Sequence, residues 1–419
     1  MAWEMAEIDA AQAEHACVTS APTSGFSCFI PPAPQPTQSG PCGICFDFNE
    51  GARVSLPEGE WRVRLSDTET HNTLFETGIG AGYVTSSKKY FVPFRVEVWH
   101  GQEKVLDHGL NLAGQPVLIQ FPVGTLGDVL GWFPYAARFA DRHACRLTCS
   151  MAGNLIPLFA GTYPTIRFVT PEQVKASDYY ATYYLGLFFG DEERHFQPGD
   201  FRLVGLHRTA GHILGVDPTE APARIDLADE SRPIPERYVC IAVQSSTQCK
   251  YWNHPTGWIE VVRFLKARGL RVLCIDQKAC HGAGLTWTTL PHGAEDFTGD
   301  WPLAERARLL KHAEFFVGLS SGLAWLAWSV GTPVSLISGF THPINEFFTP
   351  YRIFNHHTCN SCWNDPRHQF DHADFFWCPR HQGTPRQFEC TRLITPQQVT
   401  AILGRIPPRS HTAAEGLAP

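Results

Sequence analysis

One stretch of this chain, from Ala313 to Gly339, constrains its fold more than any other. It reads AEFFVGLSSGLAWLAWSVGTPVSLISG and begins with an apolar run of strand length, Phe315 to Leu319. A Ser-Ser-Gly turn follows, then a segment with room for two helical turns, which a Gly-Thr-Pro sequence ends before a second apolar run. This order predicts a strand-turn-helix-strand unit, the crossover of a parallel sheet. Its turn of small residues would expose backbone N–H groups at a helix N-terminus, where a phosphate can bind.

Two further segments show the same order of strand, turn and helix. Pro116 to Phe121 predicts a strand that leads through the glycine-containing turn 124–128 into a helix. Tyr238 to Val243 predicts another strand, followed by a polar loop and an amphipathic helix. Arg271 to Asp276 predicts the next strand and ends on an acid, which doubly wound sheets often place on a ribose hydroxyl. Two such α/β units predict two Rossmann-like domains that face each other across a cleft.

Changes in composition divide the rest of the chain. Residues 1–44 contain a proline-rich stretch and little periodicity, which predicts a flexible tail. Short β-rich runs between turn residues predict a β-rich domain. The expected order is the β-rich domain at 45–112, the two Rossmann-like domains at 113–232 and 233–345, a cysteine metal finger at 346–393, and a C-terminal helix and tail at 394–419.

The charge and hydrophobic pattern exclude some classes of protein. The chain of 419 residues carries a formal net charge of −7 and has a pI near 6.2, which argues against a nucleic-acid partner held by electrostatic attraction. The apolar stretch from Leu323 to Phe340 is interrupted by Gly331 and Pro333, so we expect no membrane span. The first residues are acidic and lack a long apolar core, so we expect no secretory signal and a cytoplasmic protein.

Four of the fourteen cysteines have the spacing of metal ligands. Cys359 and Cys362 form a CxxC pair, and Cys378 and Cys390 follow within about thirty residues. Four thiolates suit zinc and iron equally, and a closed shell of four favours a structural role. Buried thiols without a metal are the alternative. The segment around them shows little apolar periodicity, so we expect metal binding to supply much of its folding free energy.

The chain also contains several long and unusual phrases. They include VTSSKKYFV at 84–92, GTLGD at 124–128, GAEDFTG at 293–299, SGLAWLAW at 321–328 and RQFECTRLIT at 386–395. These phrases resemble those of the bacterial autotransporter heptosyltransferases of TibC type. The resemblance covers nearly everything after residue 45.

This resemblance implies a GT-B glycosyltransferase fold, with the acceptor on the first Rossmann-like domain and the donor on the second. It implies that heptose moves, with inversion, from ADP-heptose to serine hydroxyls in the passenger domain of an autotransporter adhesin. It further implies one iron ion per subunit on the four cysteines, no organic cofactor, and a homo-oligomer in the form of a dodecameric ring. Lipopolysaccharide heptosyltransferases usually carry Asp-Thr-Gly and a His where this chain has Ser320-Ser321-Gly322 and Trp325.

The chemistry of such a transfer assigns roles to the residues of the turns. A serine hydroxyl is a weak nucleophile, so transfer needs a base near the acceptor and positive groups around the departing pyrophosphate. Asp128 is the expected catalytic base, and an acid that only satisfies the helix dipole is the alternative reading of it. Lys250 with Ser246 is expected at the pyrophosphate, and Asp276 at the ribose. The full set of expected donor-binding residues is Thr125, Leu126, Gly127, Gln244, Ser246, Lys250, Asp276, Phe297, Thr298, Ser320, Ser321 and Gly322.

Two other functions stay open at this point. A lipopolysaccharide core heptosyltransferase would use the same donor without needing the cysteine segment or the β-rich domain. A non-catalytic scaffold built on the metal finger and the β-rich domain would tolerate substitution of Asp128 and Lys250.

Overall fold

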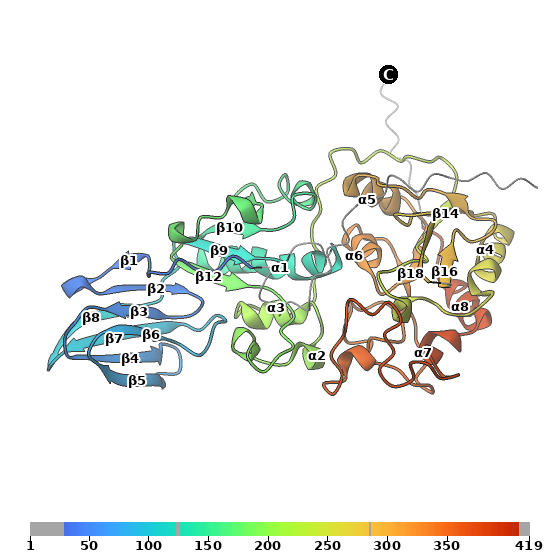
Figure 1. Ribbon diagram of the computed structural model, residues 1–419. Coiled ribbons are helices and arrows are strands. Elements are labelled where there is room, and N and C mark those ends of the chain that lie inside the picture. The colour runs from blue at the N-terminus through green and yellow to red at the C-terminus, as the bar shows by residue number, and fades with distance from the viewer. Residues whose placement is uncertain (1–28, 123–125, 285, 410–419) are drawn as a thin grey trace, which may run out of the picture.

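The computed structural model describes residues 29–122, 126–284 and 286–409. It contains two α/β halves that lie side by side, with a layered β region at the N-terminal end (Figure 1). Helices α1 and α6, one from each half, lie between the two parallel sheets (Figure 1). Within the described ranges, no helix is long and apolar enough to cross a bilayer.

The N-terminal region is a sandwich of two β layers. One layer is a four-stranded antiparallel sheet in the order β5-β4-β7-β8, and the other is formed by β2, β3 and β6 with the short β1. Phe48 and Phe94 meet between the layers with ring centroids 6.5 Å apart, so inward-facing residues of both sheets share one core. The strands are β1 Gln38–Ser39, β2 Cys45–Asn49, β3 Arg53–Leu56, β4 Trp61–Asp67, β5 Thr73–Ile79, β6 Gly82–Thr85, β7 Phe94–His100 and β8 Glu103–Gly109.

The first α/β half continues the same sheet. Strand β12 pairs in parallel with both β9 and β2, which gives the order β11-β10-β9-β12-β2-β3-β6. The boundary expected near residue 112 therefore falls inside a continuous sheet. Its elements are β9 Pro116–Gln120, α1 Leu126–His143, β10 Arg146–Ser150, β11 Arg167–Val169, β12 Ala181–Tyr184, α2 Phe201–Val204 and α3 Arg208–Ile213.

Part of the expected N-terminal tail also belongs to this fold. Phe29 is buried against Tyr184, with ring centroids 5.0 Å apart. The backbone N–H of Ile30 donates to the Gln120 side chain at 2.9 Å, and the Gln120 amide donates back to Ile30 O at 2.8 Å. Residues 29–44 are thus part of the folded domain, because this pair of hydrogen bonds and an aromatic contact hold their start against the sheet.

The second α/β half is a six-stranded parallel sheet in the order β17-β14-β13-β18-β19-β20. It confirms the strand-turn-helix-strand unit predicted from Ala313 to Gly339, which forms β18, α6 and the neighbouring parallel strand β19. Helix α4 packs by the predicted apolar stripe, which includes Trp258, Val261 and Leu265. The elements are β13 Tyr238–Ile241, α4 Gly257–Ala267, β14 Arg271–Cys274, β17 Glu295–Asp296, α5 Leu303–Lys311, β18 Phe316–Leu319, α6 Gly322–Ser329, β19 Val334–Ile337, β20 Tyr351–Ile353 and α8 Pro396–Leu403, with a separate hairpin of β15 Cys280–Ala283 and β16 Thr286–Thr289.

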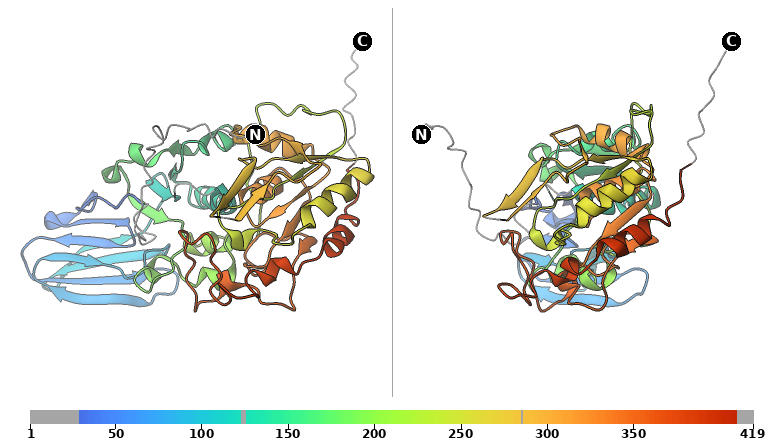
Figure 2. Two further views of the ribbon diagram at one scale, coloured as in Figure 1. Left: turned by 45° about the vertical axis from the view of Figure 1, so that its right-hand side comes forward. Right: turned by 90° about the vertical axis from the view of Figure 1, so that its right-hand side faces the viewer.

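The cysteine-rich segment 346–393 contains little regular structure beyond β20 and α7 Glu389–Arg392, but it does have an apolar core of its own. Trp363, Phe370, Trp377 and Phe388 are buried together in it. The two views of Figure 2 show this orange-red segment alongside both α/β halves. Our expectation that metal binding supplies much of the folding free energy of this segment stays a prediction, and these aromatic side chains are a further source of stability because they bury a large apolar area.

Short 3-10 helices connect several of these elements. They are Pro41–Gly43, Ile156–Leu158, Pro171–Gln173, Ala176–Asp178, Arg194–Phe196, Gln248–Lys250 and Cys362–Asn364.

Candidate functional site

The two glycine-containing turns meet where the α/β halves touch. A Cβ built on Gly127 would lie 2.9 Å from Trp325 Cδ1 and 3.4 Å from the Cα of Gly322. A Cβ built on Gly322 would lie 3.0 Å from the Cβ of Leu126. Both positions therefore need glycine for the close approach of α1 to α6, and three predicted site residues from opposite halves become neighbours.

The order of the strands explains why these turns form a site. In the first sheet α1 leads from β9 to β10 on one side, while β12 lies on the other side of β9. In the second sheet α4 leads from β13 to β14 on one side, while β18 lies on the other side of β13. Each sheet has its topological switch point there, and ligands of open α/β sheets bind at the carboxyl ends of the strands at such points.

Asp128 lies in the first turn of α1, one residue after Gly127, and is partly buried. The positive end of the helix dipole favours its carboxylate form. Through Gly127, this turn faces Trp325 and Gly322 of the other half. Thr125 lies outside the described residues.

The loop after β13 brings Lys250 and Ser246 together. The Lys250 Nζ lies 3.3 Å from Ser246 Oγ. It also lies 5.6 Å from the ring centroids of Phe340 and Phe370. The cation is thus held over two aromatic faces at the carboxyl edge of the sheet, beside the strand that leads into α6.

Asp276 is buried, and its carboxylate is hydrogen-bonded within the protein. It is 3% exposed, and its carboxylate accepts the backbone N–H groups of Val243 at 2.8 Å and Gln244 at 3.3 Å. Burial, the largest influence, raises its pKa to about 6, while these N–H groups act in the opposite direction. Asp276 therefore anchors the start of the donor loop, which weakens the predicted ribose contact.

Phe297 and Thr298 follow β17 at the outer edge of the second sheet, two strands away from β13. The Thr298 hydroxyl and N–H both donate to Asp296 Oδ1, at 2.7 and 2.9 Å. The Phe297 ring lies 6.3 Å from that of Trp301. Their expected part in donor binding, on the adenine side, stays a prediction.

The turn before α6 is hydrogen-bonded to a buried ion pair. Ser320 Oγ donates to Glu346, whose other oxygen lies 2.9 Å from Arg352 Nη1. Ser321 is the N-cap residue of α6 in an extended conformation. The Ser320 hydroxyl is thus used internally, and the first turn of α6 offers its backbone N–H groups to a ligand.

Sequence reasoning missed the role of Trp325, to which it assigned no function. Trp325 packs across the interface, where its ring lies 5.5 Å from His207 and 4.9 Å from Phe347. His207 is 1% exposed, and its Nε2 lies 2.8 Å from Glu220 Oε2. Burial raises the pKa of Glu220, but the hydrogen bonds from His207 and the Phe348 N–H outweigh it and lower the pKa overall. The only sequence signal was an indole at a position where related enzymes carry a His.

The four predicted metal ligands lie within electrostatic range of one another. Burial, and then the neighbouring Cys359 thiol, raise the pKa of Cys362 to about 12. Burial, and then Cys362, Cys378, Cys249 and Cys359, raise the pKa of Cys390, so Cys249 is a fifth thiol in this neighbourhood. A cluster of buried thiols that resist ionisation in this way is suited to a cation, because a bound metal ion reverses the penalty and deprotonates the thiols. The donor set thus fits one thiophilic metal ion.

Among the described residues, one group of three ligand atoms lies close enough together to share an ion, and it contains a single cysteine. The ligand atoms of Cys359, His381 and Glu389 lie within 4.8 Å of one another. Glu389 is already engaged, however, because it accepts from Arg386 and from the Cys359 N–H, and the Arg386 hydrogen bond is the main reason that its pKa falls to about 2. The four-cysteine site therefore stays a prediction, with His381 as a further candidate ligand.

Comparisons with known proteins bear on the whole chain. The model of the N-terminal domain of glycosyltransferase TibC matches residues 40–102, and that of glycosyltransferase family 9 (heptosyltransferase) matches residues 210–373. The autotransporter heptosyltransferase BAHTCr of Citrobacter rodentium is 58% identical over 90% of this chain and 92% of that protein. The autotransporter heptosyltransferase BimC of Burkholderia thailandensis, named as inactive, is 52% identical over 90% of this chain and 89% of that protein.

A solved structure shows the same architecture. The crystal structure of the iron-containing dodecameric glycosyltransferase TibC from enterotoxigenic Escherichia coli matches with a TM-score of 0.87 and 56% identity, over 90% of this chain and 99% of that one. TibC has also been solved in complex with ADP-D-β-D-heptose. With relatives of this identity over most of its length, two facing Rossmann-like domains and a β-rich N-terminal region, the chain belongs to the autotransporter heptosyltransferase family.

Proposed function

We propose that this protein is an inverting O-heptosyltransferase of GT-B fold that moves heptose from ADP-heptose to serine hydroxyls in the passenger domain of an autotransporter adhesin. The observation that carries the proposal is the contact of Gly127 with Trp325 and Gly322, which joins the switch points of the two sheets. A transfer reaction needs this arrangement, because the acceptor and the donor must meet in one place with their reacting atoms aligned.

The residues at this interface supply the groups that the reaction requires. As the serine oxygen attacks the anomeric carbon from the face opposite ADP, the Asp128 carboxylate accepts its proton. The bond from the anomeric carbon to the pyrophosphate breaks, and its electron pair stays on the departing ADP. Lys250, Ser246 and the N–H groups at the start of α6 stabilise that negative charge.

The cysteine segment holds a structural metal ion in this proposal. Cys359, Cys362, Cys378 and Cys390 are the ligands, with iron as the metal and zinc as the alternative. A bound ion would cross-link this segment, which contacts both halves: the Asn364 amide donates to Arg202 O at 2.9 Å, and the Gln248 N–H donates to Phe375 O at 2.8 Å. TibC is iron-containing and dodecameric, and we extend both properties to this chain, including the ring-shaped homo-oligomer.

We place the reaction in the cytoplasm. All twelve cysteines in the described part of the chain are free thiols, which matches a reducing compartment. A passenger domain would then be modified before it is exported.

The test is a transfer assay with a purified passenger fragment of an autotransporter adhesin from the same organism. Incubation with ADP-heptose should increase the intact mass of the fragment by whole numbers of heptose residues, and peptide mapping should place them on serines. The control reaction replaces the enzyme with the Asp128→Ala variant. An unchanged mass with the wild-type protein would refute the proposal and group the chain with its inactive relative.

The lipopolysaccharide core enzyme is the other candidate within the same chemistry. The match to the TibC N-terminal domain and the identity to autotransporter heptosyltransferases favour a protein acceptor over it. Transfer to a lipopolysaccharide core acceptor in place of the passenger fragment would reverse this order.

A further inference from the structure

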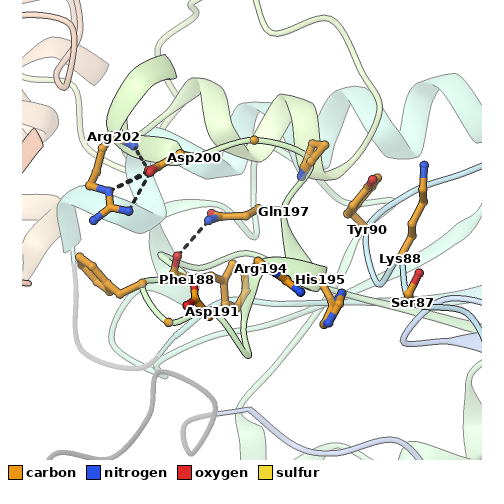
Figure 3. Close-up of a pocket in the computed structure, with 14 residues that line it drawn as sticks. Ser87, Lys88, Tyr90, Phe188, Asp191, Arg194, His195, Gln197, Asp200 and Arg202 are labelled. Carbon is orange, nitrogen blue, oxygen red and sulfur yellow. Dashed lines mark hydrogen bonds and ion pairs between the residues drawn. The ribbon is translucent and has the colours of Figure 1, made fainter. Parts of the chain in front are cut away.

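A pocket of about 420 Å³ lies in the first half of the molecule, outside the interface described above. One wall is the loop 87–90, between β6 and β7 of the β-rich region. The other wall is the segment 188–202, which follows β12. Figure 3 shows the side chains of Tyr90, Lys88 and Ser87 on one side of the pocket and those of Arg194 and Asp191 on the other.

Hydrogen bonds fix the two walls relative to each other. The Lys89 N–H donates to His195 O at 2.8 Å, which ties one wall directly to the other. Ser86 Oγ donates to Lys88 O at 2.8 Å and accepts the Ala52 N–H at 3.1 Å. Gly51 has a φ of +77°, and a Cβ there would collide with Lys88 O and Ser86 Oγ, so only glycine allows this packing. The pocket is therefore formed before any ligand arrives.

The far wall is equally well supported. The Gln197 amide donates to Phe188 O at 2.9 Å, and Asp200 holds the Arg202 guanidinium through three hydrogen bonds at 2.9, 3.1 and 2.7 Å (Figure 3). Asn364 of the cysteine segment donates to Arg202 O, so this end of the pocket reaches the metal finger.

The position of the pocket relates it to the acceptor. Strand β12 is the direct parallel neighbour of β9, and Asp128 follows β9 while the segment 188–202 follows β12. Both therefore leave the sheet at the same carboxyl edge, on the two sides of its switch point. The segment then runs through Gly205 and Leu206 to His207. A Cβ built on Gly131 of α1 would lie 3.3 Å from the Cβ of His207, so this part of the chain packs on α1. The pocket and Asp128 therefore lie at the same edge of the first sheet.

The lining suits a polypeptide better than a phosphorylated sugar. It presents partly exposed aromatic side chains at Tyr90 and Phe189, and charges of both signs at Lys88, Arg194 and Asp191. The other guanidinium of the pocket, that of Arg202, is neutralised by Asp200. A phosphate site would gather free cations and backbone N–H groups without a carboxylate among them, whereas mixed charges with aromatic anchors are typical of peptide recognition.

We propose that this pocket binds the acceptor polypeptide next to the serine that is modified, so that the β-rich domain takes part in selecting a protein acceptor. The inference rests on the proposed function. It also gives the β-rich domain a part in the reaction, because loop 87–90 belongs to the region 40–102 that matches the TibC N-terminal domain.

The test measures binding of the fluorescently labelled passenger fragment by anisotropy, without turnover. In Tyr90→Ala, which removes an aromatic anchor, and in the double variant Lys88→Ala/Arg194→Ala, the dissociation constant of the fragment should rise about tenfold, as expected for an interface anchor. The affinity for ADP-heptose, measured by calorimetry, should stay at the wild-type value. The matched control is Tyr83→Ala, which removes a 48% exposed tyrosine of the same domain that does not line the pocket.

The outcomes separate this inference from the proposed function. If both pocket variants bind the fragment with the wild-type dissociation constant, the pocket does not bind the acceptor. The same conclusion follows if Tyr83→Ala loses as much affinity for the fragment as the pocket variants do, or if the pocket variants lose affinity for ADP-heptose. If a lipopolysaccharide core acceptor displaces the labelled fragment and unlabelled fragment does not, the pocket binds a glycolipid and the inference is refuted. If the wild-type protein binds the fragment through Tyr90 yet transfers no heptose, the proposed function fails and the pocket stands.

Discussion

The contact between Gly127 and Trp325 gives the most direct test of the site. In Gly127→Ala, the added Cβ would lie 2.9 Å from Trp325 Cδ1 and 3.3 Å from Nε1, closer than van der Waals contact allows. Overpacking of this kind costs about 1–3 kcal/mol. Alanine regains at most about 1 kcal/mol through its helix propensity. Subtracting that gain leaves a net cost of about 0–2 kcal/mol, centred on about 1 kcal/mol, for the approach of α1 to α6, and this central value corresponds to a loss of about 5-fold in kcat/KM for heptose transfer.

A double-mutant cycle makes this prediction specific. The clashing atoms belong to the five-membered ring of the indole, so Trp325→Phe should make room for the added Cβ and restore part of the loss in the double variant. Transfer kinetics with the passenger fragment measure both effects. Gly78→Ala is the control, because the nearest atom to its Cβ is Trp61 O at 3.8 Å, far from the interface. Full activity in Gly127→Ala, or strict additivity with Trp325→Phe, would refute the reasoning.

Four further substitutions test the assigned roles. Asp128→Ala should abolish transfer while calorimetry shows nearly unchanged ADP-heptose affinity, because the base acts on the acceptor; undiminished turnover would remove Asp128 from the mechanism. Lys250→Ala should weaken ADP-heptose binding about tenfold or more by removing a charge-assisted contact with the pyrophosphate, and an unchanged dissociation constant would contradict that role. Cys359→Ser and Cys378→Ser should lower metal content, solubility and oligomer size together, whereas Cys42→Ser, which changes an exposed thiol, should lower none of them. Near-zero iron and zinc in wild-type protein purified without chelators would exclude the metal finger.

Local sequence patterns were sufficient for the elements that carry the site. The apolar run and small-residue turn before Trp325 predicted β18 and α6, and the periodicity of α4 predicted its buried stripe. Both depend on residues within one or two turns of one another, which sequence periodicity reports well.

Long-range pairing was not accessible in the same way. The parallel pairing of β2 with β12 joins Phe48 to Ala181, and no local signal marks two strands so far apart as neighbours. Trp325 and Gly127 are equally far apart in sequence, so no local pattern indicated that this tryptophan lies at a domain interface. The aromatic core of the cysteine segment was missed because its buried members follow no helical or strand period.

The sequence correctly placed Asp276 at the end of a strand, but the role it predicted there, binding ribose, differs from the internal anchor seen in the structure. The titration of Asp276 can decide between these two roles. A solvent-facing carboxylate that binds ribose would keep a pKa near the ordinary value of 3.8, whereas burial raises the pKa of Asp276 to about 6. Because the folded state then holds a proton that the unfolded state has lost, this group stabilises the fold at low pH, and its contribution is lost as the pH rises through 6. Between about pH 5 and about pH 7.5 the loss amounts to about 1 kcal/mol. The stability of the wild type relative to Asp276→Asn, measured by denaturant unfolding, should therefore fall by that amount over this range. A difference that stays constant with pH would mean that the carboxylate faces solvent, and it would restore the ribose assignment.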